Sequence, residues 1–196
     1  MANCGSGDVV YETLKRKGIT NNFTLAGILA VSAKETGFLL RPELGYQNTS
    51  NSRIRQVFSV FNTKSDSEID RLKRDPEKFF NFLYGGKYGN SPNEGYKYRG
   101  RGFNGVTFKD VYKDLNRFAT VDIVKNPDAL NDTNTAAEVL AGYFISNWTR
   151  YPKILRAWNI SNYNNPANLA DAVGAAFNVT GGVGDRKSTR LNSSHS

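Results

Sequence analysis

Two glutamates, Glu35 and Glu43, are the side chains of this sequence best suited to acid–base chemistry. Glu35 falls in the last turn of an apolar segment with helical spacing, where a helix dipole disfavours negative charge. Partial burial there would favour the protonated form, which a general acid requires. Gly37 and Pro42 let the chain fold back, so Glu43 could face Glu35. Two facing carboxyl groups are the minimum that glycoside hydrolysis requires. The alternative from spacing alone is that both glutamates are merely solvated.

A second segment that could do chemistry is EGYKYRGRGFNGVTF, residues 94–108. Its glycines permit the backbone to approach a ligand closely. Arg99 and Arg101 could hold carboxylates or position the glutamate pair. The rings that could lie flat against sugars are those of Tyr96, Tyr98 and Phe103. The alternative is an irregular hairpin with exposed arginines, and the glycine spacing does not match a nucleotide-phosphate loop.

Composition excludes several other kinds of site. The chain has 196 residues, a net charge of +8, one cysteine (Cys4) and one histidine (His195). A Ser-His-Asp triad, a Cys-His pair or a histidine-rich metal site would have to use His195, so we expect neither metal nor cofactor. Cys4 cannot form an internal disulfide. No apolar run is long enough to span a membrane, and the start lacks the pattern of a secretory signal.

The last residues, 185–196, read DRKSTRLNSSHS and resemble a translated sequencing-library adapter. We interpret them as a non-native tail; the alternative is a natural polar tail, which the same composition would give. Without them the chain loses three basic residues, one acidic residue and its histidine, so the net charge becomes +6. On this interpretation the natural protein continues past Gly184, and we expect the C-terminus of the fold to be truncated.

The elements that must position these residues are mainly helices. Apolar periodicity predicts helices before Gly18, between Asn22 and Gly37, and from Asp75-Pro76 onward. Further helices are expected to begin at Thr107, at Asp132 or Thr133, and at Asn165-Pro166. The glycine- and tyrosine-rich stretch 85–105 is expected to form turns and short strands. With no repeat and no linker, residues 1–184 are predicted to be one α+β domain, helix-rich with a small β region in its middle.

Taken together, the motifs resemble family 19 glycoside hydrolases. The motifs that carry this resemblance are ETGF followed by a second glutamate, then YGN, YRGRGF and VT, with VDIVKNPDALNDTNTAAEVLAGYF and FNVTGG downstream. The similarity covers roughly residues 10–184 and is closest to the chitinase-like endolysins and tail lysozymes of phages, in the lysozyme-like superfamily. YRGRGF is the most specific of these motifs. ETGF is less specific, because lytic transglycosylases carry a similar motif.

The resemblance implies a role for three residues. Glu35 aligns with the general acid, Glu43 with the second acid that activates or holds water, and Thr107 with a hydroxyl that helps to position that water. The implied reaction inverts the configuration at the anomeric carbon and needs no metal. The structural alternative for Thr107 is that it caps a helix.

Further residues are implied as contacts of the substrate or of the acid pair: Tyr46, Tyr98, Arg99, Arg101, Asn104 and Asn178. Tyr46 could equally be a core tyrosine. The family usually has Gln where Gly105 stands and Asn where Val111 stands, and both contact sugar. Asn104 could replace the first of these.

The function implied is hydrolysis of β-1,4 bonds between N-acetylated amino sugars, in peptidoglycan or in chitin. One alternative is a lytic transglycosylase that uses Glu35 alone, and another is a non-catalytic wall-binding or virion structural module. The partner expected is a polysaccharide, and an anionic wall suits a basic protein. Nucleic acid is not expected, because the cations alternate with acids, as in KSDSEIDRLKRDPEK. The resemblance also implies a monomer in the host cytoplasm before release, or on the virion.

Overall fold

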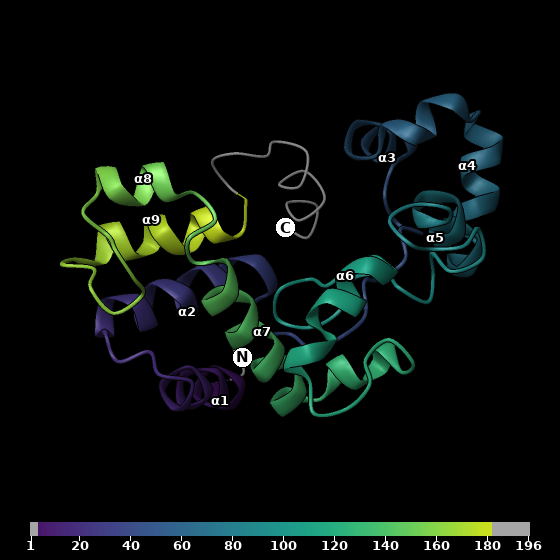
Figure 1. Ribbon diagram of the computed structural model, residues 1–196. Helices are drawn as coiled ribbons and strands as arrows, with labels where there is room; N and C mark the ends of the chain where they lie inside the picture. Colours follow the sequence, from purple (N-terminus) through teal and green to yellow (C-terminus); the bar gives the residue numbers. More distant parts are fainter. Residues whose placement is uncertain (1–3, 182–196) are drawn as a thin grey trace.

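The computed structural model describes residues 4–181, and these residues form nine α-helices and three short 3-10 helices (Figure 1). The α-helices are α1 (Cys4–Arg16), α2 (Asn22–Thr36), α3 (Asn51–Val57), α4 (Asp66–Lys73), α5 (Pro76–Tyr84), α6 (Lys109–Leu115), α7 (Thr133–Asn147), α8 (Pro152–Ala157) and α9 (Leu169–Val179). The 3-10 helices are η1 (Ser59–Thr63), η2 (Asn116–Phe118) and η3 (Pro127–Asn131). None of the described helices is long and apolar enough to cross a membrane.

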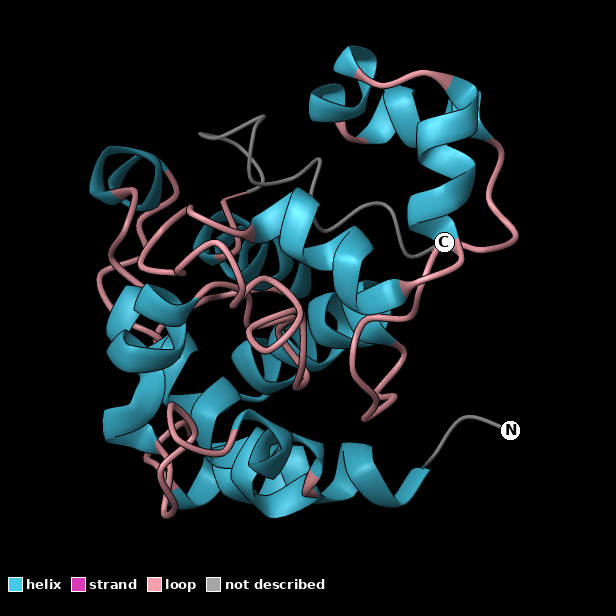
Figure 2. Cartoon of the chain, turned by 90° about the vertical axis from the view of Figure 1, so that its right-hand side faces the viewer, coloured by secondary structure: helices cyan, strands magenta, loops and turns pink. Residues whose placement is uncertain are grey.

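The predicted α+β class is wrong, because the molecule is helical. Helices account for 58% of it, and its described part contains no sheet (Figure 2). The only extended pairing in that part is an isolated antiparallel bridge between Arg101 and Val106, whose N–H···O distances are 3.1 and 2.7 Å. The segment expected to hold short strands, 85–105, is instead a succession of turns.

The glycines of this segment explain why it turns instead of extending. Gly102 and Gly105 have φ angles of 78° and 60°, so the chain reverses between the two residues of the bridge and cannot continue as a ladder. Side chains then donate hydrogen bonds to backbone carbonyls that, in a sheet, would accept them from a neighbouring strand. The guanidinium of Arg101 donates to the carbonyls of Lys97 and Arg99, at 2.7 and 3.2 Å.

Several helix boundaries follow the predicted local signals. Asp75 caps α5 by accepting a hydrogen bond from the N–H of Lys78 at 3.2 Å, and Pro76 occupies the first turn. Asp132 caps α7 through the N–H of Thr135 at 2.9 Å. Gly37 ends α2 in the left-handed conformation, as predicted.

Other boundaries differ by a few residues. Asn21, and not Asn22, caps α2, and the last helix begins at Leu169 behind an Asn168 cap, later than the expected Asn165-Pro166. Thr107 does not cap α6, which begins two residues later without a side-chain cap. For α2 and α9 another asparagine within a few positions offers the same side-chain chemistry, so the sequence left the choice open.

Helices α2 and α9 run parallel and touch closely. At their beginnings Asn21 donates from its amide to the carbonyl of Pro166 at 2.9 Å. Farther along, a Cβ added at Gly27 would lie 2.9 Å from the backbone of Ala172, so only glycine allows this approach. Since both helices rise by the same amount per residue, their C-terminal ends also lie together. The end of α2 carries Glu35, and the end of α9 carries Asn178.

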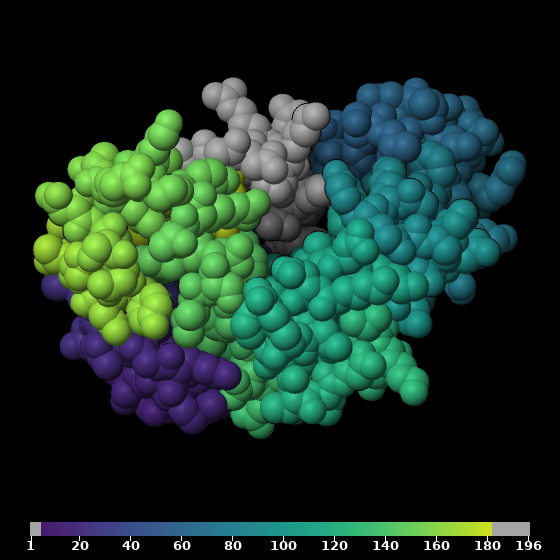
Figure 3. Space-filling model, in the orientation of Figure 1, coloured from purple at the N-terminus to yellow at the C-terminus, as the bar shows by residue number. Residues whose placement is uncertain are grey.

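The core consists of three apolar clusters. The first joins α1, α2, α7 and α9, the second is the aromatic cluster of α3, η1 and α5, and the third lies under α6 and η3. Figures 1 and 3 show α3, α4 and α5 at one end of the molecule and α1, α2, α8 and α9 at the other, with residues 85–131 between them. The segment that links α2 to α3 contains Glu43 and runs between these two ends.

Candidate functional site

Glu43 lies in the extended segment between α2 and α3 and is 8% exposed. Its N–H donates to the carbonyl of Gly100 at 2.8 Å, and its own carbonyl accepts from Nε of Arg99 at 3.2 Å. These two bonds join the second glutamate to the YRGRGF segment. The structure therefore brings together the two segments that the sequence singled out for chemistry.

Two tyrosine hydroxyls donate to the Glu43 carboxylate. The hydroxyl of Tyr46 lies 2.8 Å from Oε1, and that of Tyr84 lies 3.1 Å from Oε1 and 3.0 Å from Oε2. The N–H of Gly100 adds a longer contact of 3.4 Å to Oε2. Both carboxylate oxygens thus act as hydrogen-bond acceptors. Tyr46, expected beside the substrate or in the core, instead has its ring among Phe58, Phe79 and Phe80 and its hydroxyl on Glu43.

Tyr84 is a residue of the site that the sequence analysis missed. It is the last residue of α5, 3% exposed, and its ring stacks on Phe80 and meets the edge of Phe108. Burial raises the pKa of Tyr84 well above its ordinary value, and the neighbouring charge of Glu43 raises it further. The hydroxyl therefore remains a proton donor over the whole working range of pH. Its only signal in the sequence was its place on the apolar face of a predicted helix, which indicated core packing alone.

The Glu43 carboxylate and the hydroxyl of Thr107 both lie beside Gly100. A Cβ added at Gly100 would lie 3.4 Å from Glu43 Oε2 and 3.4 Å from Thr107 Oγ1, so both oxygens border the same point. The hydroxyl of Thr107 donates to the carbonyl of Gly105 at 3.0 Å, which leaves its lone pairs available as acceptors. A carboxylate and a hydroxyl therefore lie near the same space beside this glycine.

Glu35 occupies the last turn of α2 and is partly buried. Burial raises the pKa of Tyr143 on α7, and the charge of Glu35 makes a minor further contribution. The hydroxyl of Tyr143 donates to the carbonyl of Val179 at the end of α9, at 2.8 Å. The parallel packing of α2 and α9 places the end of α2, which carries Glu35, on the same side of the molecule as this contact.

Asn178, next to that contact, has an amide without a partner. Its side chain is 2% exposed, and neither Oδ1 nor Nδ2 makes a hydrogen bond with any residue that the structure describes. Buried polar groups are nearly always paired, so an amide that offers both a donor and an acceptor here is suited to a ligand with the complementary pair. The hydroxyl of Ser32 on α2 is also buried and unpartnered.

The two arginines expected near the acid pair, Arg99 and Arg101, make different hydrogen bonds. Nη1 of Arg99 donates to the carbonyl of Tyr96 at 2.7 Å while Nε holds the backbone of Glu43, not its carboxylate. Burial lowers the pKa of Arg99, and the charge of Arg101 lowers it further. Arg101 is 4% exposed and bonds Asp128, two carbonyls and the hydroxyl of Tyr112, so it braces the loop.

The remaining expected contacts are divided between core and site. Tyr98 is 1% exposed and donates its hydroxyl to the carbonyl of Val124 at 2.9 Å, so its ring faces the third cluster. Asn104 is partly buried, and its Oδ1 has no partner among the described residues. Val111 is 38% exposed. His195 lies outside the described residues.

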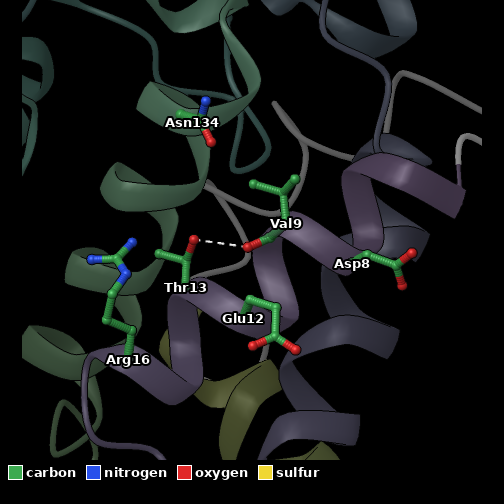
Figure 4. A pocket seen from close by; sticks show the side chains of 6 residues that line it. All are labelled: Asp8, Val9, Glu12, Thr13, Arg16 and Asn134. Atoms are coloured by element: carbon green, nitrogen blue, oxygen red, sulfur yellow. Dashed lines mark hydrogen bonds between the residues drawn. The ribbon is translucent and has the colours of Figure 1, made fainter.

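A shallow hollow of about 340 Å³ lies elsewhere, between α1 and the start of α7 (Figure 4). It is lined by Asp8, Val9, Glu12, Thr13, Arg16 and Asn134. The Thr13 hydroxyl is already bonded to the carbonyl of Val9 at 2.7 Å, and Arg16 pairs with Glu138. No group of three metal-ligating side chains occurs there or elsewhere between residues 4 and 181. The hollow therefore offers less chemistry than the surroundings of Glu43.

Comparison with known proteins does not assign the chain to a family. No protein-family model matches it, and no curated protein sequence does. The candidate site therefore stands on its own geometry: a buried carboxylate held by two tyrosines, a threonine hydroxyl across Gly100, and a second glutamate at the end of α2.

Proposed function

We propose that this protein hydrolyses β-1,4 bonds between N-acetylated amino sugars, in peptidoglycan or chitin, with inversion at the anomeric carbon. The observation that carries the proposal is that the Glu43 carboxylate and the Thr107 hydroxyl both border the space where a Cβ on Gly100 would lie. A water molecule between them would give one proton to the carboxylate and attack with its oxygen. An enzyme with a single acid, such as a lytic transglycosylase, would have no need for this arrangement.

In the proposed reaction Glu35 is the general acid. Its proton passes to the bridging oxygen as the bond from that oxygen to the anomeric carbon breaks. Water adds its hydroxyl to the opposite face of the carbon, and Glu43 takes the other proton. The position of Glu35 in the last turn of α2, where the side chain is partly buried, supports this role.

The proposed substrate class follows from Asn178. A secondary amide presents one N–H and one C=O, and the side chain of Asn178 offers one acceptor and one donor that the protein leaves unused. An acetamido group on a sugar is such an amide. The parallel packing of α2 and α9, which places the end of α9 on the same side of the molecule as Glu35, supports its use in the same substrate complex.

The test is a parallel digestion of peptidoglycan and chitin oligomers, with identification of the new ends and of their anomeric form. We expect reducing ends of inverted configuration from the wild type. Glu35→Gln and Glu43→Gln should each lose activity by about a hundredfold or more. Glu12→Gln is the matched control, because this glutamate is exposed on α1.

The outcomes separate the alternatives. Anhydro-sugar products together with an active Glu43→Gln variant would indicate a lytic transglycosylase. Retained binding of the polymer without any new ends would indicate a non-catalytic module. Full activity of Glu35→Gln would contradict every version in which Glu35 is the acid.

A further inference from the structure

Tyr84 contacts Glu43 in a way that a purely structural tyrosine would not require. Its single hydroxyl lies at similar distances from the two carboxylate oxygens, 3.1 Å from Oε1 and 3.0 Å from Oε2. A hydroxyl placed in this way faces the middle of the carboxylate edge and restrains rotation of the group. The other hydroxyl, of Tyr46, contacts Oε1 alone.

The ring of Tyr84 is itself held firmly. It stacks on Phe80 one turn earlier in α5, with centroids 5.9 Å apart, and meets Phe108 edge-on at 5.1 Å. The carbonyl of Tyr84 accepts a hydrogen bond from the amide of Asn90 at 3.0 Å. Phe108 directly follows Thr107 in the chain, so Tyr84 contacts Glu43 and the neighbour of Thr107.

We propose that Tyr84 is a positioning residue that fixes the plane of the Glu43 carboxylate, so that Oε2 stays on the side of Gly100 and Thr107. This inference rests on the proposed function, in which Glu43 accepts a proton from water. Without the hydroxyl, Oε2 keeps only the 3.4 Å contact to the N–H of Gly100, and the carboxylate can turn away from Thr107. Glu43 would also lose a donor that favours its charged form.

The test compares the wild-type full chain with Tyr84→Phe, which removes one oxygen and keeps the ring. We expect kcat to fall by about tenfold to a hundredfold with KM nearly unchanged, since a hydrogen bond to a charged group is lost and sugar contacts are not.

A second measurement does not depend on turnover. Carbon-13 NMR of glutamate-labelled protein at a fixed pH observes the Glu43 carboxylate, with Glu43→Gln identifying its signal. We expect the chemical shift of this carboxylate to change in Tyr84→Phe, because the contacts of the Tyr84 hydroxyl with both oxygens are lost. Tyr112→Phe is the matched control, because it also removes a buried tyrosine hydroxyl, one that bonds the carbonyl of Arg99 at 2.7 Å and not Glu43.

Each outcome decides one point. A Glu43 carboxylate signal that is unchanged in Tyr84→Phe, or that shifts equally in Tyr112→Phe, overturns the proposal. A fall in activity that tracks only a loss of melting temperature, as in the control, overturns it as well. If the wild type cuts neither polymer, the proposed hydrolysis fails, while the NMR comparison still decides whether Tyr84 positions Glu43.

Discussion

Replacement of Arg101 by methionine is expected to destabilise the protein substantially while keeping the apolar stem of the side chain. The guanidinium is buried and makes four bonds, to Asp128, to the carbonyls of Lys97 and Arg99, and to the hydroxyl of Tyr112. The loss of these bonds is not uniform. The carboxylate of Asp128 is well exposed and can bond to water instead. The carbonyl of Arg99 still accepts a hydrogen bond from the hydroxyl of Tyr112.

The main cost therefore arises at the carbonyl of Lys97, which loses a 2.7 Å bond from a buried donor, and at the Tyr112 hydroxyl. A buried acceptor left unpaired costs about 1–3 kcal/mol, and a lost bond from a charged donor adds a similar amount. We expect the free energy of unfolding to fall by about 3 kcal/mol, and the melting temperature by roughly 6–12 °C in a chain of this size.

Urea denaturation and thermal melting measure this effect, with Asp128→Asn as the matched control. The control removes only the exposed half of the ion pair and should cost under about 1 kcal/mol. Arg101→Lys should fall between the two, because an ammonium cannot reproduce the planar fork. If Arg101→Met costs no more than Asp128→Asn, the carbonyl bonds do not hold the loop, and the reasoning is refuted.

Three further predictions concern other parts of the molecule. Gly100→Ala should change stability by less than about 1 kcal/mol yet reduce polymer cleavage strongly, because its methyl group would fill the space between the carboxylate and the hydroxyl; equal losses in melting and cleavage assays would contradict this. Asn164→Ala removes bonds to the turn at 18–21 and should cost about 1–2 kcal/mol in urea denaturation. Burial alone would raise the pKa of Glu138, but hydrogen bonds from the cations at 16–17 lower it below 4.5. This pairing therefore stabilises the fold above pH 4.5, and its contribution is lost as the pH falls through the lowered pKa of Glu138. Glu138→Gln should flatten the acid side of a plot of unfolding free energy against pH, and an unchanged slope would count against the pairing.

Helix ends show what the sequence by itself determined. Asp75 and Asp132 bond to N–H groups three residues away, and Gly37 bonds to a carbonyl four residues back. Such contacts lie within one turn, so residue type and spacing are sufficient to predict them. The same local view failed for residues 85–105, where a β region was expected, because the carbonyls there are satisfied by Arg101 and not by a neighbouring strand.

The candidate site was predictable in its residue types and not in its assembly. Glu35 and Glu43 could be named as candidates from their types and spacing, since few other side chains in a chain with one histidine suit acid–base chemistry, whereas Thr107 was implied only by the family resemblance. Only the tertiary structure brought Tyr84 and Gly100 to Glu43, across 41 and 57 positions of the chain. No local pattern encodes contacts of that separation, because they depend on how α5 and the loop before α6 pack. The sequence thus supplied the candidate groups, and packing decided which of them share a hydrogen-bonded site.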